Sequence, residues 1–232
     1  FVHNTGLYGA VIYSKYSKAL VIQFSYAYKN HVLRYGAIFN LHKPEYIAMT
    51  NITFKTNFGG SIIIKLPILV SIMNSRFYQN SDLVEGVCLL IEAIENKESH
   101  IKIHLCNFIS SNLQNNKKGI NSIVMSMRNI EKLILEDINF EVGSEGSASI
   151  TAVAEIRVKN LLAHKIYFKS NFSSVYLFAS SIVEFAELDL VSFNCPINSY
   201  IEEGISNIDY KKIDVWYKCM TCKYRFYTLS NN

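Results

Sequence analysis

The feature that most constrains the fold of this chain is a repeat built on aromatic anchors. Positions seven, five and two before each anchor are mostly apolar, as Ile47, Met49 and Ile52 are before Phe54. A unit that cannot bury its apolar stripe alone must stack on neighbouring copies, so the pattern predicts a solenoid. Six phenylalanines, separated by 23, 31, 32, 28 and 25 residues, are the anchors: Phe54, Phe77, Phe108, Phe140, Phe168 and Phe193.

The spacing within a copy predicts strands that turn a corner. Residues two apart in a strand share one face, and the step of three between the second and third apolar positions marks a bend at which the chain keeps pointing inward. Residues 208–215 are a seventh copy, with Val215 in place of the anchor. Tyr28 is the expected anchor of the first copy, although Gln23 then falls on an apolar position. The sequence thus predicts an all-β fold, a right-handed parallel β-helix of about seven to eight coils.

Composition agrees with this fold and limits the partners. Half of the 232 residues are hydrophobic, which is enough apolar material for a long core. The net charge of +4 is small and the 23 basic residues are spread along the chain, which disfavours nucleic acid as a partner. Lys65, Pro67, Glu92 and Arg128 interrupt the longest apolar runs, so no direct membrane span is expected.

The two ends of the sequence differ from its middle. The chain begins at Phe1 rather than at Met, so it is expected to be a fragment of a longer chain or a mature form. Residues 1–217 carry the repeats and are predicted to form the parallel β-helix domain. Residues 218–232 follow the last copy and are predicted to start a cysteine-containing C-terminal extension.

Two short motifs accompany the anchors. A strand that opens with glycine or a small residue precedes several copies, as in Gly59-Gly60-Ser61-Ile62-Ile63, and glycine permits the bent backbone of a corner. Asparagine follows the anchor by three positions at Asn57, Asn80 and Asn171. Asparagines stacked in successive coils can hydrogen-bond one another, so these residues predict a ladder.

Together, the Gly-Gly-Ala-Ile-like strands and the Phe-x-x-Asn turns resemble the repeats of bacterial polymorphic outer-membrane proteins and of related surface proteins in unicellular eukaryotes. The resemblance covers residues 6–215, although the turns after Phe140 and Phe193 depart from it. It implies a pectin-lyase-like β-helix displayed outside the cell and used for adhesion or surface architecture. It does not imply catalysis, and no cofactor is expected.

Four of the five cysteines fall into two groups. Cys88 and Cys106 lie on inward positions, where a thiol serves as core filling. Cys219 and Cys222 follow the last copy as a lone pair, which is compatible with a disulfide-rich extension, with unpaired thiols or with a metal site. The disulfide interpretation is favoured, so both are candidate disulfide residues and no metal is assigned.

Two sequons are candidate N-glycosylation sites. Asn51 of Asn51-Ile52-Thr53 lies at the predicted bend, where a glycan can project outward. Asn171 of Asn171-Phe172-Ser173 is also a ladder asparagine, and a side chain buried there cannot carry sugar.

One outward-facing column is the best candidate for chemistry. The position four before each anchor points away from the core, and successive strands stack about 4.8 Å apart. Alternating imidazole and carboxylate groups could bind a metal or support acid-base cleavage of a polysaccharide, the chemistry of β-helix enzymes. The simpler interpretation, which we favour, is an exposed ladder of unlike groups that attract one another. The polar members of the column are His104, Glu136, His164 and Asp189.

These observations favour a structural or adhesive scaffold that is secreted or displayed at the cell surface. The expected partners are other copies of the chain or other surface proteins, assembled into a filament or coat, with glycans as further candidates. The alternative is a carbohydrate-active β-helix enzyme or a glycan-binding module. Release of new sugar ends from a polysaccharide would favour the enzyme.

Overall fold

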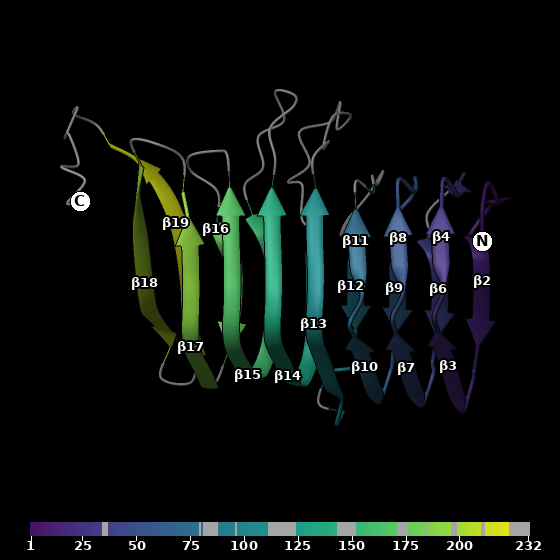
Figure 1. The fold of residues 1–232 in the computed structure, drawn as a ribbon. Helices are drawn as coiled ribbons and strands as arrows, with labels where there is room; N and C mark the ends of the chain where they lie inside the picture. The colour runs from purple at the N-terminus through teal and green to yellow at the C-terminus, as the bar shows by residue number, and fades with distance from the viewer. Residues whose placement is uncertain are drawn as a thin grey trace.

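Strands stacked in a row make up the chain in its computed structural model, which describes residues 1–33, 37–78, 80, 88–95, 97–110, 124–142, 152–170, 176–183, 185–195, 199–209 and 212–222. The described residues form no helix, and so none that could cross a bilayer. Figure 1 shows the row from β2 near the N-terminus to β18 and β19 at the other end. The strands are β1 (Thr5–Gly6), β2 (Gly9–Lys15), β3 (Ala19–Gln23), β4 (Tyr26–Tyr28), β5 (His31–Val32), β6 (Ala37–His42), β7 (Tyr46–Thr50), β8 (Thr53–Lys55), β9 (Ile62–Lys65), β10 (Leu69–Met73), β11 (Arg76–Tyr78), β12 (Leu89–Glu92), β13 (His100–Ser110), β14 (Met125–Val142), β15 (Ala152–Ser170), β16 (Tyr176–Val183), β17 (Phe185–Asn194), β18 (Ser199–Asp209) and β19 (Lys212–Thr221).

Strands of successive turns pair in parallel and in register. Leu20 of β3, Ile47 of β7, Val70 of β10 and Ile101 of β13 face one another in line. The stack continues through β14, β15 and β17, in which one longer strand covers positions that earlier turns divide between two or three strands. The predicted all-β parallel solenoid is therefore confirmed. About five turns have a parallel neighbour on both sides, fewer than the seven to eight coils expected.

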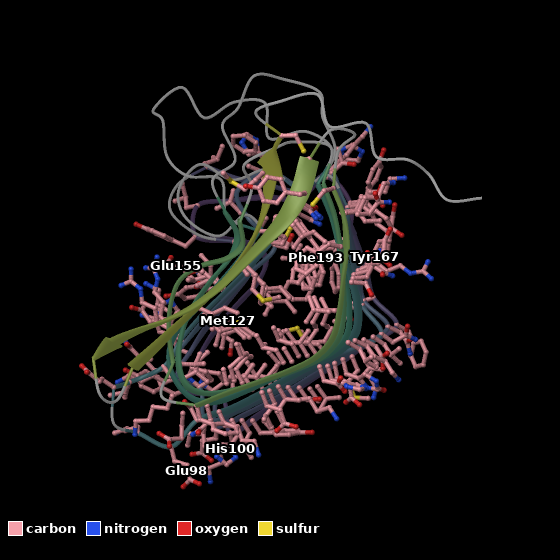
Figure 2. All side chains as sticks on the ribbon, turned by 90° about the vertical axis from the view of Figure 1, so that its left-hand side faces the viewer. Glu98, His100, Met127, Glu155, Tyr167 and Phe193 are labelled. Carbon is pink, nitrogen blue, oxygen red and sulfur yellow. The ribbon has the colours of Figure 1, made fainter. Side chains whose placement is uncertain are left out.

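Four of the aromatic anchors form one stack in the interior. Ring centroids lie 5.2 Å apart between Phe54 and Phe77, 4.7 Å between Phe77 and Phe108, and 5.3 Å between Phe108 and Phe140. All four side chains are fully buried. Stacked aromatic pairs contribute about 0.5–1.5 kcal/mol each beyond the burial of their area. Figure 2 looks along the solenoid and shows this interior filled with side chains, with Phe193 inside and His100 outside.

The first copy has a different register from the one predicted. Ala27 pairs with Phe54 and is the anchor, whereas Tyr28 pairs with Lys55 on the outer face. Gln23 pairs with Thr50 and therefore belongs to an outward column. The prediction for Tyr28 was wrong by one residue, and a shift of one residue reverses the face that every side chain takes.

The step of three in the repeat produces a corner with left-handed backbone. Asparagine and aspartate adopt this conformation readily, but Phe24, Leu105 and Leu190 adopt it only because the paired strands on either side hold it. Gly59 lies at a different bend, at which only glycine fits. Its φ is 102°, and an added Cβ would lie 2.6 Å from the Cβ of Val32. The corner residues, with φ between 47° and 57°, are Phe24, Asn51, Asn74, Leu105, Asp137, Lys165 and Leu190.

A ladder of buried asparagines holds a second corner. The Nδ2 of Asn30 donates to Oδ1 of Asn57 at 3.0 Å, and the Nδ2 of Asn57 donates to Oδ1 of Asn80 at 2.9 Å. The same two oxygens accept the backbone N–H groups of Asn30 and Asn57. The predicted ladder is confirmed for Asn57 and Asn80 and extends to Asn30 and Asn4. Asn171 lies outside the described residues.

The C-terminal end of the solenoid is an antiparallel hairpin. β18 and β19 pair with each other in antiparallel fashion, and β19 also pairs antiparallel with β16. Figures 1 and 2 show the two strands at this end of the stack. The prediction of a seventh parallel copy at residues 208–215 was therefore wrong. Val215 lacks the aromatic ring that would continue the anchor stack, and the hairpin satisfies backbone groups that another turn would have paired. β19 runs through the predicted domain boundary at residues 217–218.

The ladder gives a direct test of the fold. Asn57→Ala is expected to lower the free energy of unfolding by about 2 kcal/mol or more, because the buried amide of Asn30 loses its acceptor. Urea unfolding followed by circular dichroism measures this change. Asn107→Ala, on the outward face of β13, is the control and is expected to change stability by less than about 0.5 kcal/mol. Equal effects of the two substitutions would contradict the ladder.

Candidate functional site

The predicted outward column lies where the sequence places it. His104 of β13 pairs with Glu136 of β14, Glu136 with His164 of β15, and His164 with Asp189 of β17. All four side chains are partly exposed. The in-register stacking therefore brings four groups that are distant in sequence into one line on the surface.

The contacts within this column differ from simple alternation. The Nδ1 of His164 lies 2.8 Å from Oδ2 of Asp189, so these two groups form the predicted imidazole–carboxylate pair. Among the described contacts, Glu136 forms no ion pair with His104 or His164. Its Oε2 lies 3.0 Å from Nζ of Lys102 instead. Lys102 is in the adjacent outward column, two residues before His104 on the same strand. The column is thus an ion-pair network that includes a neighbouring lysine.

Asp137 is a member of the site that the sequence reasoning missed. Its Oδ2 lies 3.4 Å from Nε2 of His104, and its Oδ1 lies 3.6 Å from Nζ of Lys165. Asp137 occupies the left-handed corner next to Glu136, which turns its carboxylate toward the preceding turn. The step of three in the repeat was the available signal, since it marks a corner residue as part of the outer surface.

The lysine determines the electrostatics of Glu136. A hydrogen bond from Lys102 lowers the pKa of the Glu136 carboxyl below its usual value, and the charges of Lys102 and His104 act in the same direction. The carboxylate is ionised at neutral pH. Both partners are about a third or more exposed, so water screens the attraction and the pair contributes little to stability.

His104, Glu136 and Asp137 could together hold a metal ion. Each offers one ligand atom, and the three atoms lie within 4.8 Å of one another. One imidazole and two carboxylates suit Zn²⁺ or Mn²⁺. A metal would have to displace the ammonium groups of Lys102 and Lys165 from the two carboxylates, which weakens any such site.

Four cysteines have side chains among the described residues, and their environments bear on the predictions. Cys88 and Cys106 are buried, which confirms them as core filling, and burial raises the pKa of the Cys106 thiol to about 11. Cys195 is disulfide-bonded, which the sequence reasoning did not anticipate. Cys222 carries a free thiol, and the side chain of Cys219 lies outside the described residues. A disulfide role for Cys219 and Cys222 stays a prediction.

One of the two sequons is described. Asn51 lies at the left-handed corner with a half-exposed side chain, and its Oδ1 accepts a hydrogen bond from Nδ2 of Asn74. A glycan on Asn51 would project from the outer surface, and its attachment would disrupt the hydrogen bond with Asn74. Glycosylation of Asn51 and of Asn171 stays a prediction.

The chain is defined by its fold as a parallel β-solenoid. No protein-family model, no curated protein and no solved structure matches it.

The ion pair at Glu136 makes a measurable prediction. In Lys102→Gln the pKa of Glu136 is expected to rise toward its usual value, because the hydrogen bond that favours the ionised carboxylate is lost. Because the pKa of Glu136 is depressed in the folded state, its ion pair stabilises the folded protein at pH values above the pKa of the unfolded chain. This contribution is lost as the pH falls through the folded-state pKa. Lys102→Gln removes it at every pH. A ¹³C NMR titration of the Glu136 carboxyl measures the shift. Lys132→Gln is the control, and an equal change in it would rule out the proposed pairing.

Proposed function

We propose that this protein is a structural and adhesive scaffold outside the cell or on its surface, and that it acts as a stiff rod. The continuous interior stack is the observation that supports this proposal most strongly. Every turn between β6 and β15 is hydrogen-bonded in parallel to both neighbours and shares one filled core with them. Such a structure resists bending and presents long, regular faces to partners.

Three further features support this location and role. The outer polar column consists of ion pairs of the ordinary sheet-stabilising kind, such as that between His164 and Asp189. The disulfide at Cys195 fits an oxidising compartment. The Phe and Asn columns correspond to the motifs that resemble repeats of polymorphic outer-membrane proteins, whose β-helices are displayed outside the cell.

The two ends of the described solenoid offer different surfaces for assembly. The hairpin of β18 and β19 occupies the C-terminal end, where its antiparallel pairing interrupts the coil. Among the described strands, β3 pairs with β7 alone, so its other edge is free to add a strand. We infer that this edge pairs with a further strand, supplied by a preceding coil of a longer chain, by another copy or by another surface protein.

Surface labelling of cells that produce the full-length protein tests the location. A membrane-impermeant, amine-reactive biotin reagent is expected to label the protein on intact cells, because Lys15 and Lys43 are exposed in the solenoid. A cytosolic protein of the same cells is the control and should stay unlabelled. Labelling that requires prior permeabilisation of the cells would contradict an extracellular scaffold.

A carbohydrate-active enzyme is the second candidate, and the cluster of His104, Glu136 and Asp137 is the observation that favours it. An enzyme of this kind would release new reducing ends from a polysaccharide, and Glu136→Gln would abolish the release. The release of reducing ends would be measured on neutral and acidic polysaccharides, with and without Zn²⁺. If the rate with the protein equals the rate in buffer alone, the enzyme is ruled out and the scaffold is the function.

A further inference from the structure

Charge is distributed unevenly along this chain. Residues 1–80 contain eight lysines and arginines but a single acidic residue, Glu45. The remaining 152 residues contain fifteen basic and eighteen acidic residues. Because sequence order is also the order of stacking, the N-terminal turns of the rod are strongly basic and the later turns are slightly acidic.

Parallel pairing gathers part of this charge into a column. Lys15 at the end of β2 pairs with His42 of β6, and His42 pairs with Lys65 of β9. Adjacent parallel strands lie about 4.8 Å apart, so the three groups form a straight line along the rod axis. The column ends at Glu92 of β12, which is in register with Lys65.

Aromatic rings accompany the basic column. The Nζ of Lys15 lies 5.7 Å from the ring centroid of Tyr13, and the Nζ of Lys43 lies 5.1 Å from that of Tyr16. Tyr13 is 51% exposed and Tyr16 is 70% exposed, so both rings are accessible to a partner. We call Tyr13, Lys15, Tyr16, His42, Lys43 and Lys65 the basic patch.

The lysines of the basic patch lack carboxylate partners. The ion pairs that the structure shows among described residues lie between residues 98 and 189, and none involves Lys15, Lys43 or Lys65. By contrast, Lys102 and Lys169 each lie within 3.0 Å of a glutamate oxygen. None of the three lysines therefore forms an ion pair within the described residues, although Glu92 lies one strand away from Lys65.

The pKa of His42 reflects its position between two lysines. Burial and then the charges of Lys65 and Lys15 lower the pKa of its imidazole. His42 is consequently neutral at pH 7, and the lysines carry the charge of the patch. An anion bound at this column would attract both ammonium groups and relieve the repulsion between Lys15 and Lys65.

We propose that the basic patch binds a linear acidic polysaccharide along the rod axis, with anionic groups at the lysines and sugar rings on Tyr13 and Tyr16. Lys15 and Lys65 lie two strand spacings apart along the rod axis, about 9.6 Å, with Lys43 beside the column, and such a row of lysines suits a polymer that carries anionic groups along its length. Exposed aromatic faces contact the apolar faces of sugars. The choice of a polysaccharide over other polyanions rests on the proposed extracellular location.

Binding to immobilised alginate and heparin tests this inference, with carboxylate groups on the first and mainly sulfate groups on the second. The triple variant Lys15→Gln, Lys43→Gln, Lys65→Gln is expected to bind at least about tenfold more weakly than the wild type to the probe that the patch recognises. The wild-type affinity is expected to fall as salt rises. Dextran, a neutral polysaccharide, is expected not to bind.

A matched variant separates the patch from net charge. Lys102→Gln, Lys159→Gln, Lys169→Gln removes the same charge from lysines that already pair with carboxylates. It is expected to keep the wild-type affinity within about twofold. Equal losses in the two triple variants, or no binding of the wild type to either acidic polysaccharide, would overturn the proposal.

The tyrosines distinguish sugar from other polyanions. Tyr13→Ser with Tyr16→Asn is expected to weaken polysaccharide binding while circular dichroism stays unchanged, because both rings are exposed. Tighter binding to duplex DNA or to phosphatidylserine-containing vesicles than to either polysaccharide would also overturn the proposal. All these measurements use purified protein, so failed surface labelling would count against the extracellular location, whereas failed binding would count against the patch.

Discussion

In-register parallel stacking is the constraint on which the rest of this structure depends. It places each phenylalanine anchor on the one before it, with Phe77 and Phe108 only 4.7 Å apart between ring centroids. It also places each ladder asparagine where its Oδ1 accepts both a side-chain and a backbone N–H of the neighbouring turn. A slip of one residue would expose the anchors and leave the asparagines buried without partners, and these costs enforce the register.

The same register organises the outer surface into columns. The charged groups of the column of His104, Glu136, His164 and Asp189 form ion pairs with one another or with neighbouring residues, and these pairs stabilise the fold. The lysines of the basic patch on the N-terminal turns take part in no such ion pair among the described residues. The register therefore produces two kinds of column. In one the charged groups pair with each other and stabilise the fold, and in the other the lysines are able to bind a partner.

Much of this architecture could be predicted from the sequence because the anchors, the step of three and the asparagines recur with a readable period. The first turn was misread because the aromatic Tyr28 follows the true anchor, Ala27, and is the more obvious candidate. The terminal hairpin was not predictable from the same pattern, since apolar alternation is identical in parallel and antiparallel strands. Lys15 and Lys65 looked scattered because they are 50 residues apart, and only the register brings them into one column.

The most direct test of this account is a cysteine cross-link between turns. Ala48 of β7 and Ser71 of β10 are in-register neighbours on the outer face, whereas Ala48 and Lys102 are separated by one whole turn. Oxidation of Ala48→Cys, Ser71→Cys is predicted to give a disulfide between these positions in peptide mapping, because their Cα atoms lie within bridging distance. Ala48→Cys, Lys102→Cys should give none. A disulfide in the second variant and not in the first would contradict the stacking register.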